Sequence, residues 1–361
     1  MVLPDLDIPS QLTATLAFLL TANTAFAQQK QAQDPAVACA RCHSSQAQTQ
    51  SLTAMRRALQ LPGTNAILNS HPKLTFQKFG YTYRVETKDG QSTYSVTDES
   101  QTITLPILWS FGDDAQTWVF ERDGVYYESL VSYYPSVGGL GITIGDLDIT
   151  PRNLDEAVGR KLPPNEPVAC FGCHSTGAVR DGQLLTLGSL QPGVACEHCH
   201  VGAISHMASA VQGEGMETAT PDLRKLTSED LSDFCGQCHR SWETVIRGPW
   251  RGELSVRFQP YRLANSKCFS GTDPRISCIA CHDPHKNLVT DPAAYDVKCL
   301  TCHTLKGAAP AAKSQITAKA CPVQKNNCAS CHMPEVKLAN GLAIFHDHLI
   351  RIVKSGMPYP D

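Results

Sequence analysis

The pattern Cys-x-x-Cys-His occurs seven times in this chain of 361 residues, and no other feature restricts the possible folds as strongly. It takes up fourteen of the sixteen cysteines, whereas aromatic residues make up only 7% of the chain. A core poor in aromatic side chains and rich in cysteine and histidine is expected to form around a group that is not protein. We number the motifs 1 to 7 in chain order: Cys39, Cys42 and His43; Cys170, Cys173 and His174; Cys196, Cys199 and His200; Cys235, Cys238 and His239; Cys278, Cys281 and His282; Cys299, Cys302 and His303; Cys328, Cys331 and His332.

The spacing within the motif is that of covalent attachment sites for c-type haem. On one helical turn, positions i, i+3 and i+4 share a face. Two thiols on that face can form thioethers with the two vinyl groups of the porphyrin, and the histidine then lies under the ring as the proximal iron ligand. The sequence therefore predicts seven covalently attached haem c groups.

Three other uses of paired cysteines are the alternatives. Zinc sites contain Cys-x-x-Cys pairs, but zinc does not require a histidine directly after the second cysteine. A thioredoxin-like dithiol occurs once in a domain rather than seven times. A disulfide framework suits an exported protein, but its cysteines are not paired this regularly.

The first residues predict export from the cytoplasm. The apolar run over residues 12–27 ends in Ala25-Phe26-Ala27, which matches the hydrophobic and cleavage regions of a secretory signal. Asp5 and Asp7 stand where positive residues are usual, and a buried N-terminal helix is the alternative. The run is too short to span a membrane. We predict a signal peptide over residues 1–27 and a periplasmic or extracellular mature protein.

The distances between motifs predict the domain organisation. From motif 2 onward, successive motifs begin 26, 39, 43, 21 and 29 residues apart, whereas motif 1 begins 131 residues before motif 2. No ordinary domain fits in the shorter gaps, so six haems are expected to share one compact region and to exchange electrons by tunnelling. We predict a first haem-binding segment over 28–72, a β-rich insertion over 73–150 and a hexahaem domain over 151–361.

The insertion differs from the rest of the chain in its residue pattern. Apolar and polar residues alternate on both sides of Asp89-Gly90 and again around Asp123-Gly124, which predicts two β-hairpins with tight turns. The motif region shows little helical periodicity. The predicted fold class is mostly α with much irregular chain, organised around stacked c-type haems, with a small antiparallel β insertion between motifs 1 and 2. The insertion either shields the first haem or docks a redox partner.

The histidine count limits the coordination of the irons. Thirteen histidines minus seven proximal ones leave six for the opposite, distal positions, so at least one iron has another ligand or an open site. We predict His71, His206, His285 and His348 as distal ligands, with His71 assigned to the haem of motif 1. His198, between two attachment cysteines, and His346 are expected to be exposed or to lie behind a ligand.

Two cysteines and the net charge complete the sequence observations. Cys268 and Cys321 lie outside the motifs and predict a disulfide in an oxidising compartment, with free thiols as the alternative. The net charge of −3 gives no electrostatic case for nucleic-acid binding.

Several stretches resemble exported bacterial multihaem c-type cytochromes, in particular the superfamily of pentahaem nitrite reductase and octahaem hydroxylamine oxidoreductase. They are "FGCHST", "PGVACEHCHVGAISH", "RFQPYRLANSKC", "SCIACHDPHK", "CASCHMP" and "HDHLIRI", spread over roughly residues 35–353. The resemblance implies distal roles for His206, His285 and His348. The chain departs from it in two ways: the Cys-x-x-Cys-Lys motif of the nitrite reductases is absent, and Val201 replaces the usual glycine after His200.

Two functions follow as expectations. The first is electron transfer with redox partner proteins, either other cytochromes or a quinol-oxidising membrane complex. The alternative is an oxidoreductase that acts on a small nitrogen or sulfur compound at a haem with an open axial position. The absence of a Cys-x-x-Cys-Lys motif argues only against the nitrite reductase version of the second function.

Overall fold

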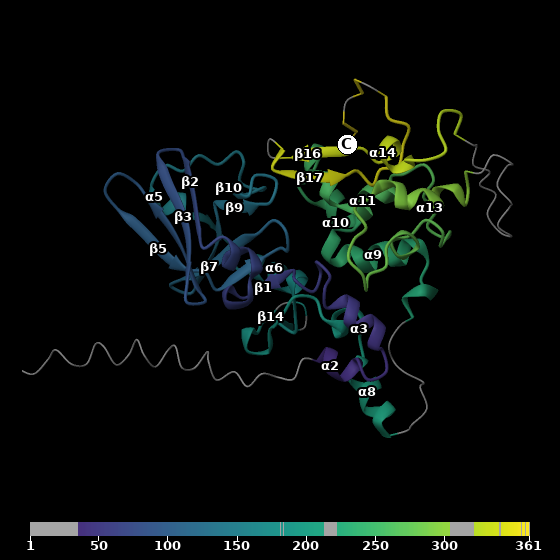
Figure 1. Ribbon diagram of the computed structural model, residues 1–361, viewed down its shortest axis with the longest axis horizontal. Coiled ribbons are helices and arrows are strands. Elements are labelled where there is room, and N and C mark those ends of the chain that lie inside the picture. Colours follow the sequence, from purple (N-terminus) through teal and green to yellow (C-terminus); the bar gives the residue numbers. More distant parts are fainter. Residues whose placement is uncertain are drawn as a thin grey trace, which may run out of the picture.

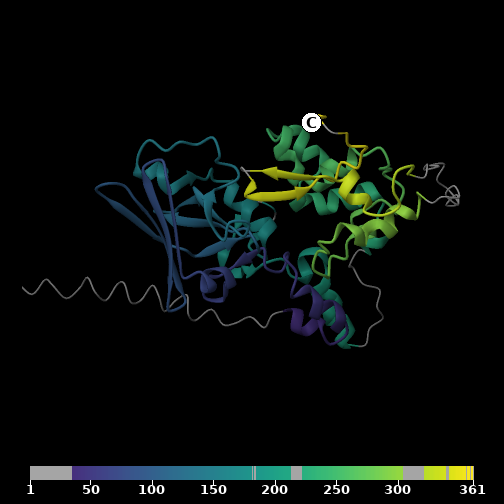
Figure 2. The ribbon, with the colours of Figure 1, turned by 45° about the horizontal axis from the view of Figure 1, so that its top comes forward.

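The structure is a computed structural model that describes residues 35–180, 182, 184–212, 222–303, 321–338, 341–354, 356–357 and 359–360. The predicted signal peptide lies outside these residues. Figure 1 shows two lobes side by side, and Figure 2 shows the same division from another angle. We call residues 59–161 the β lobe, and residues 35–50, 196–212, 222–303 and 321–354 the motif lobe.

The first sheet of the β lobe contains the first predicted hairpin. Its order is β2-β3-β4-β5, all antiparallel, with Tyr83 paired to Val96 across the β3–β4 hairpin. The turn residues Asp89 and Gly90 both have positive φ, 51° and 75°, as a two-residue hairpin turn of this kind requires. The strands are β2 (Lys73–Lys78), β3 (Tyr81–Lys88), β4 (Gln91–Thr97) and β5 (Thr102–Pro106).

The second sheet contains the second predicted hairpin and recruits strands from outside the predicted insertion. Its order is β1-β6-β7-β8-β11, and Asp123 and Gly124 form the β7–β8 turn at φ 54° and 74°. The strands are β1 (Leu59–Gln60), β6 (Trp109–Phe111), β7 (Thr117–Arg122), β8 (Val125–Ser129) and β11 (Gly159–Lys161); β9 (Val131–Tyr134) and β10 (Gly139–Ile142) pair separately.

A large aromatic cluster forms the core of the β lobe. Tyr83, Tyr94, Trp118 and Phe120 are at most 1% exposed. The rings of Tyr94 and Phe120 stack at 4.8 Å, and the Tyr94 hydroxyl donates to the Val158 carbonyl at 3.1 Å. Each buried aromatic ring removes a large apolar area from water, so this core stabilises the lobe without any other group. Short helices complete the lobe: η1 (Pro62–Thr64), α4 (Ala66–Ser70) and α5 (Leu154–Val158).

Helix α6 (Glu166–His174) carries motif 2 and packs against the β lobe. Phe171, fully buried on this helix, meets the rings of Trp109 and Phe111 edge-on at 5.1 and 5.2 Å. Motif 2 therefore lies at the junction of the two lobes. Short segments follow it: β12 (Ser175–Thr176), β13 (Val179–Arg180), β14 (Leu184–Leu185), η2 (Leu187–Ser189) and β15 (Gln191–Pro192).

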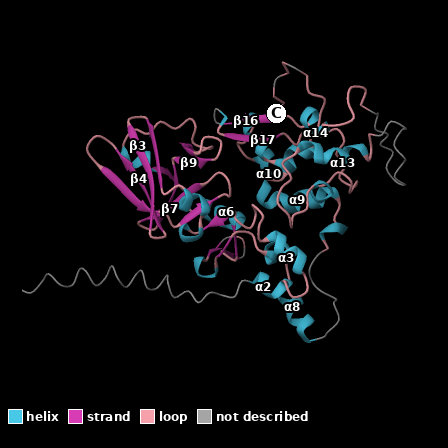
Figure 3. Cartoon of the chain, viewed as in Figure 1, coloured by secondary structure: helices cyan, strands magenta, loops and turns pink. Residues whose placement is uncertain are grey.

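The motif lobe consists of short helices with little apolar core. Its largest described cluster of buried apolar side chains contains only Val245, Phe258 and Tyr261. The helices are α2 (Pro35–Cys39), α3 (Ser44–Gln50), α7 (Cys196–Cys199), α8 (Ala203–Gln212), η3 (Leu223–Lys225), α9 (Ser228–His239), α10 (Trp242–Arg247), η4 (Gly252–Arg257), α11 (Gln259–Ala264), α12 (Cys278–Cys281), η5 (Pro292–Tyr295), α13 (Asp296–Leu300) and α14 (Cys328–His332). The hairpin of β16 (Glu335–Leu338) and β17 (Ala343–His346) lies among them (Figure 3).

The prediction of a mostly α fold was wrong. Of the described residues, 35% are helical and 24% are in strands, which form several antiparallel sheets. The β lobe is larger than the predicted insertion because β1 and β11 pair with its edges from outside residues 73–150. Strands of two or three residues carry no alternating pattern long enough to be read from a sequence. Among the described helices, none is long and apolar enough to cross a membrane.

Candidate functional site

Each of the seven motifs forms one helical turn. In motifs 2, 4 and 7 the turn ends the helices α6, α9 and α14. In the other four, the backbone N–H of the histidine donates to the carbonyl of the first cysteine: His43 to Cys39 at 2.9 Å, His200 to Cys196 at 2.9 Å, His282 to Cys278 at 2.8 Å and His303 to Cys299 at 3.0 Å. An α-turn places residues i, i+3 and i+4 on one side, as the attachment of one porphyrin requires.

Motif 1 lies beside motif 3 although 157 residues separate their first cysteines, Cys39 and Cys196. The backbone N–H of Val194 donates to the Met55 carbonyl at 2.9 Å, and the Gln50 side chain donates back to the Val194 carbonyl at 2.7 Å. Gly193, at φ +75°, makes this approach possible, because a Cβ there would lie 1.8 Å from the Arg56 carbonyl oxygen.

Cysteine side chains of different motifs lie close together. These contacts connect motifs 1 and 3, 2 and 4, 4 and 5, and 6 and 7. The cysteine pairs are Cys39 with Cys196, Cys173 with Cys238, Cys235 with Cys278, and Cys299 with Cys328. None of them is a disulfide, because all sixteen cysteines are free. These contacts place motifs that are far apart in the sequence in three groups: 1 with 3, 2 with 4 and 5, and 6 with 7.

Three proximal histidines each face a second histidine from another segment. The ring centroids of His43 and His206 are 6.3 Å apart. Those of His200 and His285 are 6.0 Å apart with planes within 9° of parallel, and those of His282 and His348 are 6.2 Å apart. The three partners are the predicted distal ligands His206, His285 and His348.

These separations fit two imidazoles that share one metal ion. With metal–nitrogen bonds of about 2 Å, a metal between two imidazole nitrogens separates the ring centroids by roughly 6 Å. Directly stacked imidazoles would lie closer than this. No three His, Cys, Asp or Glu side chains in the described part of the chain gather into a metal cluster of their own. The pairs therefore fit an iron held between two axial histidines.

Hydrogen bonds orient several rings so that Nε2 is available to a metal. The Nδ1 atom lies 2.9 Å from the Ala58 carbonyl oxygen in His174, 2.7 Å from the Arg351 carbonyl oxygen in His332, and 3.0 Å from the His346 carbonyl oxygen in His348. Metal-binding histidines usually donate their second ring N–H to such an acceptor. In His206, Nδ1 is buried without a hydrogen-bond partner among the described residues, so this nitrogen is available to bind a metal.

Burial favours the neutral form of four of these imidazoles, which is the form that binds iron. It lowers the pKa of His174, His200 and His282, because the charged form loses its hydration. It lowers the pKa of His348 to about 4, and the nearby His282 adds to the shift. The unprotonated His348 ring therefore persists at every pH from about 5 upward.

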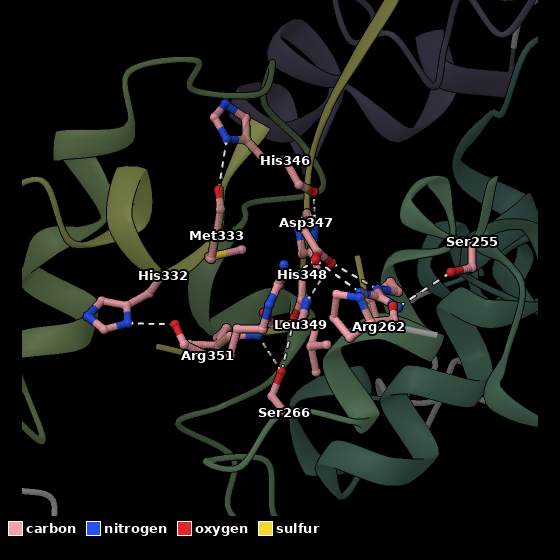
Figure 4. Close-up of polar contacts among 12 residues, drawn as sticks. Ser255, Arg262, Ser266, His332, Met333, His346, Asp347, His348, Leu349 and Arg351 are labelled. Carbon is pink, nitrogen blue, oxygen red and sulfur yellow. Dashed lines mark hydrogen bonds and ion pairs between the residues drawn. The ribbon is translucent and has the colours of Figure 1, made fainter. Parts of the chain in front are cut away.

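A buried ion pair fixes the segment that carries His348 (Figure 4). The carboxylate of Asp347 accepts two hydrogen bonds from the Arg262 guanidinium, at 2.8 and 3.0 Å, and both side chains are at most 1% exposed. The same carboxylate also accepts from the backbone N–H of Leu349 at 3.0 Å. A bidentate pair of this kind sets the orientation of its backbone, and His348 is the next residue.

Three other proximal histidines, His174, His239 and His332, are not in ring contact with a second histidine among the described residues. His174 and His239 lie within electrostatic reach of each other. His303 precedes residues 304–320, which lie outside the described part.

The spare histidines that face no proximal one make other contacts. His71, the predicted distal ligand of motif 1, packs in the β lobe 5.1 Å from the Tyr133 ring, and His206 lies at motif 1 instead. His346 lies 3.9 Å from the Glu335 carboxylate and 3.2 Å from the Met333 carbonyl oxygen. His198 is half-buried within the turn of motif 3.

The predicted disulfide between Cys268 and Cys321 is not present, and both thiols are free. Cys268 lies within electrostatic reach of Cys299 and Cys302, and burial raises its pKa. The Cys321 thiol interacts instead with the backbone of Gln324 and Val323, which lowers its pKa. The two cysteines therefore occupy different surroundings.

Comparison with known proteins gives one match. The family model for cytochrome c554 and c-prime matches residues 152–201, which contain motifs 2 and 3. No curated protein and no solved structure matches the chain. The resemblance to nitrite reductase and hydroxylamine oxidoreductase is not confirmed by this match and stays a prediction. The match supports a c-type cytochrome with covalently bound haem c and a redox role.

Proposed function

We propose that this chain is an exported seven-haem c-type cytochrome that transfers electrons between redox partner proteins. The observation that carries the proposal is the three histidine pairs, whose centroid separations of 6.0–6.3 Å fit iron with both axial positions occupied. Such an iron has no open position for a substrate, so it is suited to electron transfer.

The residues of the chain have separate tasks in this function. The fourteen motif cysteines would hold seven haems as thioethers, and the seven motif histidines would hold the irons. When bound, haem supplies a one-electron iron couple. The paired imidazoles of His43 and His206, His200 and His285, and His282 and His348 would hold the iron and fix its surroundings.

The contacts between motifs support a continuous electron path. Thiol contacts connect motif 1 to 3, 2 to 4, 4 to 5, and 6 to 7. Two further gaps are bridged electrostatically: Cys199 of motif 3 lies within reach of Cys235 and Cys238, and Cys281 of motif 5 within reach of Cys299. Each motif thus has a neighbour, and haems attached at adjacent turns are close enough for tunnelling.

The location and partners belong to the same proposal. The apolar run over residues 12–27 supports export to the periplasm or cell surface. A soluble carrier there receives electrons from other cytochromes or from a quinol-oxidising membrane complex.

A second function is favoured by the unpaired proximal histidines. His174, His239 and His332 have no second histidine ring in contact among the described residues. An open haem at one of these motifs would bind a small nitrogen or sulfur compound and make the protein an oxidoreductase.

Mass spectrometry and low-temperature EPR test the proposal together. The mature protein is expected to carry seven covalent haem additions, and fewer would contradict the count. His206→Ala and His285→Ala are each expected to convert one low-spin haem to high-spin, because each removes one axial ligand. His71→Ala is the matched control, since His71 packs against Tyr133, and it is expected to leave the spectrum unchanged.

The same spectra separate the two functions. Under the electron-transfer proposal, nitrite or hydroxylamine leaves the wild-type signals unchanged. A wild-type high-spin signal that shifts with either compound supports the oxidoreductase, and low-spin spectra in His206→Ala and His285→Ala would refute the pairing.

A further inference from the structure

Two arginines at the junction of the lobes have no hydrogen-bond or ion-pair partner among the described residues. The Arg257 guanidinium lies 5.2 Å from the Phe258 ring centroid, and its Nε is buried without a partner. The Arg240 guanidinium lies 4.7 Å from the Trp250 ring centroid. Both arginines are half-buried, and the Nε of Arg257 is a buried N–H donor without an acceptor among the described residues.

By contrast, the chain provides acceptors for the guanidinium of Arg262, which is 1% exposed. Arg262, five residues after Arg257, donates to both oxygens of Asp347 and to the Pro360 carbonyl at 2.9 Å. Burying a guanidinium without such acceptors is costly. The contrast indicates that the buried Nε of Arg257, with Arg240 within electrostatic reach, is available to a group that the polypeptide does not provide.

The acidic residues nearby are already bound by another arginine. Glu128 and Glu166 lie within electrostatic reach of Arg257 and Arg240, respectively. Both accept hydrogen bonds from Arg160 instead, at 2.6 and 2.7 Å. Arg240 and Arg257 also lie within electrostatic reach of each other, and like charges at close range repel. An anion between or beside them would remove that repulsion.

The pair lies next to motifs 2 and 4. Arg240 directly follows His239, and it is within electrostatic reach of His174, Cys173 and Cys238. The backbone of Arg240 has φ +66°, which residues other than glycine rarely adopt, so the surrounding structure holds the backbone in this conformation. The two guanidiniums therefore border the space in which the haems of these motifs would lie.

We propose that Arg240 and Arg257 form a binding site for a carboxylate or similar oxyanion beside the haems of motifs 2 and 4. The planar guanidinium fork matches two oxygens of one such group. The anion is either a propionate of one of these haems or a small free oxyanion that reaches the iron of His174. This inference rests on the proposed function, because both sources require attached haem.

The test compares Arg240→Gln and Arg257→Gln with Arg247→Gln in the full-length haem-loaded protein. Arg247 is the matched control because its side chain is 78% exposed and pairs with Glu243 at 2.6 Å on α10. Redox titration followed in the visible spectrum gives the potential of each haem component. Titration of the oxidised protein with nitrite, and separately with acetate, gives the affinity for a free anion.

The two sources predict different results. If the anion is a propionate, each glutamine variant lowers the potential of one haem component, because the propionate loses its compensating charge and then favours ferric iron. If the anion is free, the potentials stay the same and nitrite or acetate binds about tenfold more weakly or worse, since charged hydrogen bonds are lost. Arg247→Gln changes neither quantity.

Potentials and anion affinities equal to those of Arg247→Gln in both variants would overturn the site. Where a glutamine variant does not mature, Arg240→Lys or Arg257→Lys replaces it, because lysine keeps the charge but not the fork. The haem count of the wild type is read first: a count below seven is a failure of the proposed function, whereas unchanged variants at the full count refute the anion site alone.

Discussion

The two lobes differ in what fills their interiors. In the β lobe, one cluster contains seventeen buried apolar residues. The largest described cluster of the motif lobe contains three. Yet the motif lobe holds all the motifs except motif 2, which lies at the junction. The motif lobe has few buried apolar side chains for its size, so under the proposed function the haems would provide much of its interior. The β lobe has no such need.

Preventing haem attachment has the largest expected effect on this comparison. Produced in a host without cytochrome maturation, the chain is expected to keep its β lobe and to lose the fold of the motif lobe. Limited proteolysis with mass spectrometry should then find a resistant fragment close to residues 59–161. Because α6 packs against the β lobe, the C-terminal end of this fragment is expected to lie beyond residue 161. A resistant fragment over residues 222–303 would show that the motif lobe folds without haem.

A substitution in the core of the β lobe has the second largest expected effect. Trp118→Ala removes a fully buried ring and is expected to lower the free energy of unfolding by about 3–5 kcal/mol. Chemical denaturation followed by circular dichroism measures the change, while the haem absorption of the folded protein stays as in the wild type. Trp242, 47% exposed on α10, is the control, and Trp242→Ala should have a much smaller effect. Equal losses in the two variants would remove the distinction between the lobes.

In the motif lobe, the Arg262–Asp347 pair is a fully buried ion pair, and breaking it has the next largest expected effect. Asp347→Asn leaves the buried guanidinium without its carboxylate and is expected to destabilise the lobe by about 3 kcal/mol. It is also expected to convert one haem partly to high-spin, because His348 loses its fixed position opposite His282. EPR detects this change.

The control for Asp347→Asn is Glu156→Gln, which breaks an ion pair with Arg152 on the surface of the β lobe. That variant should keep both the wild-type stability and the wild-type spectrum. If Asp347→Asn lowers stability but leaves all haems low-spin, the ion pair is only structural and does not position His348.

Local features of this structure were predictable from the sequence, and long-range pairings were not. The hairpins at Asp89-Gly90 and Asp123-Gly124 are confirmed, because turn residues act within a few positions. The sequence also identified His206 as a spare histidine, but not that it faces His43. That pairing depends on the approach of residues 55–56 to Gly193, which no local pattern reports. Similarly, nothing in the sequence distinguishes Arg240 and Arg257 from the satisfied Arg262.

The smallest effect concerns a buried carboxylate in the β lobe. Asp146 is 1% exposed, and neither of its carboxylate oxygens has a hydrogen-bond partner among the described residues. Burial, with the nearby Glu128, therefore raises its pKa to about 6, against the partial compensation of Arg160 at 3.5 Å. Below about pH 4 the Asp146 carboxyl is protonated in both states and does not lower the free energy of unfolding. The folded state disfavours the charged form, so the free energy of unfolding of the β lobe falls as the pH rises from about 4 to 6.

Asp146→Asn removes that dependence. Its free energy of unfolding relative to the wild type is expected to rise between about pH 4 and pH 6 and to reach roughly 2–3 kcal/mol near pH 7, since one pKa unit corresponds to about 1.4 kcal/mol. Denaturation at several pH values, followed by tryptophan fluorescence and by haem absorption, checks the change in each lobe. A difference that stays flat with pH would refute the raised pKa. A shift in the haem transition equal to that of the β lobe would show that the two lobes unfold as one unit, despite their different interiors.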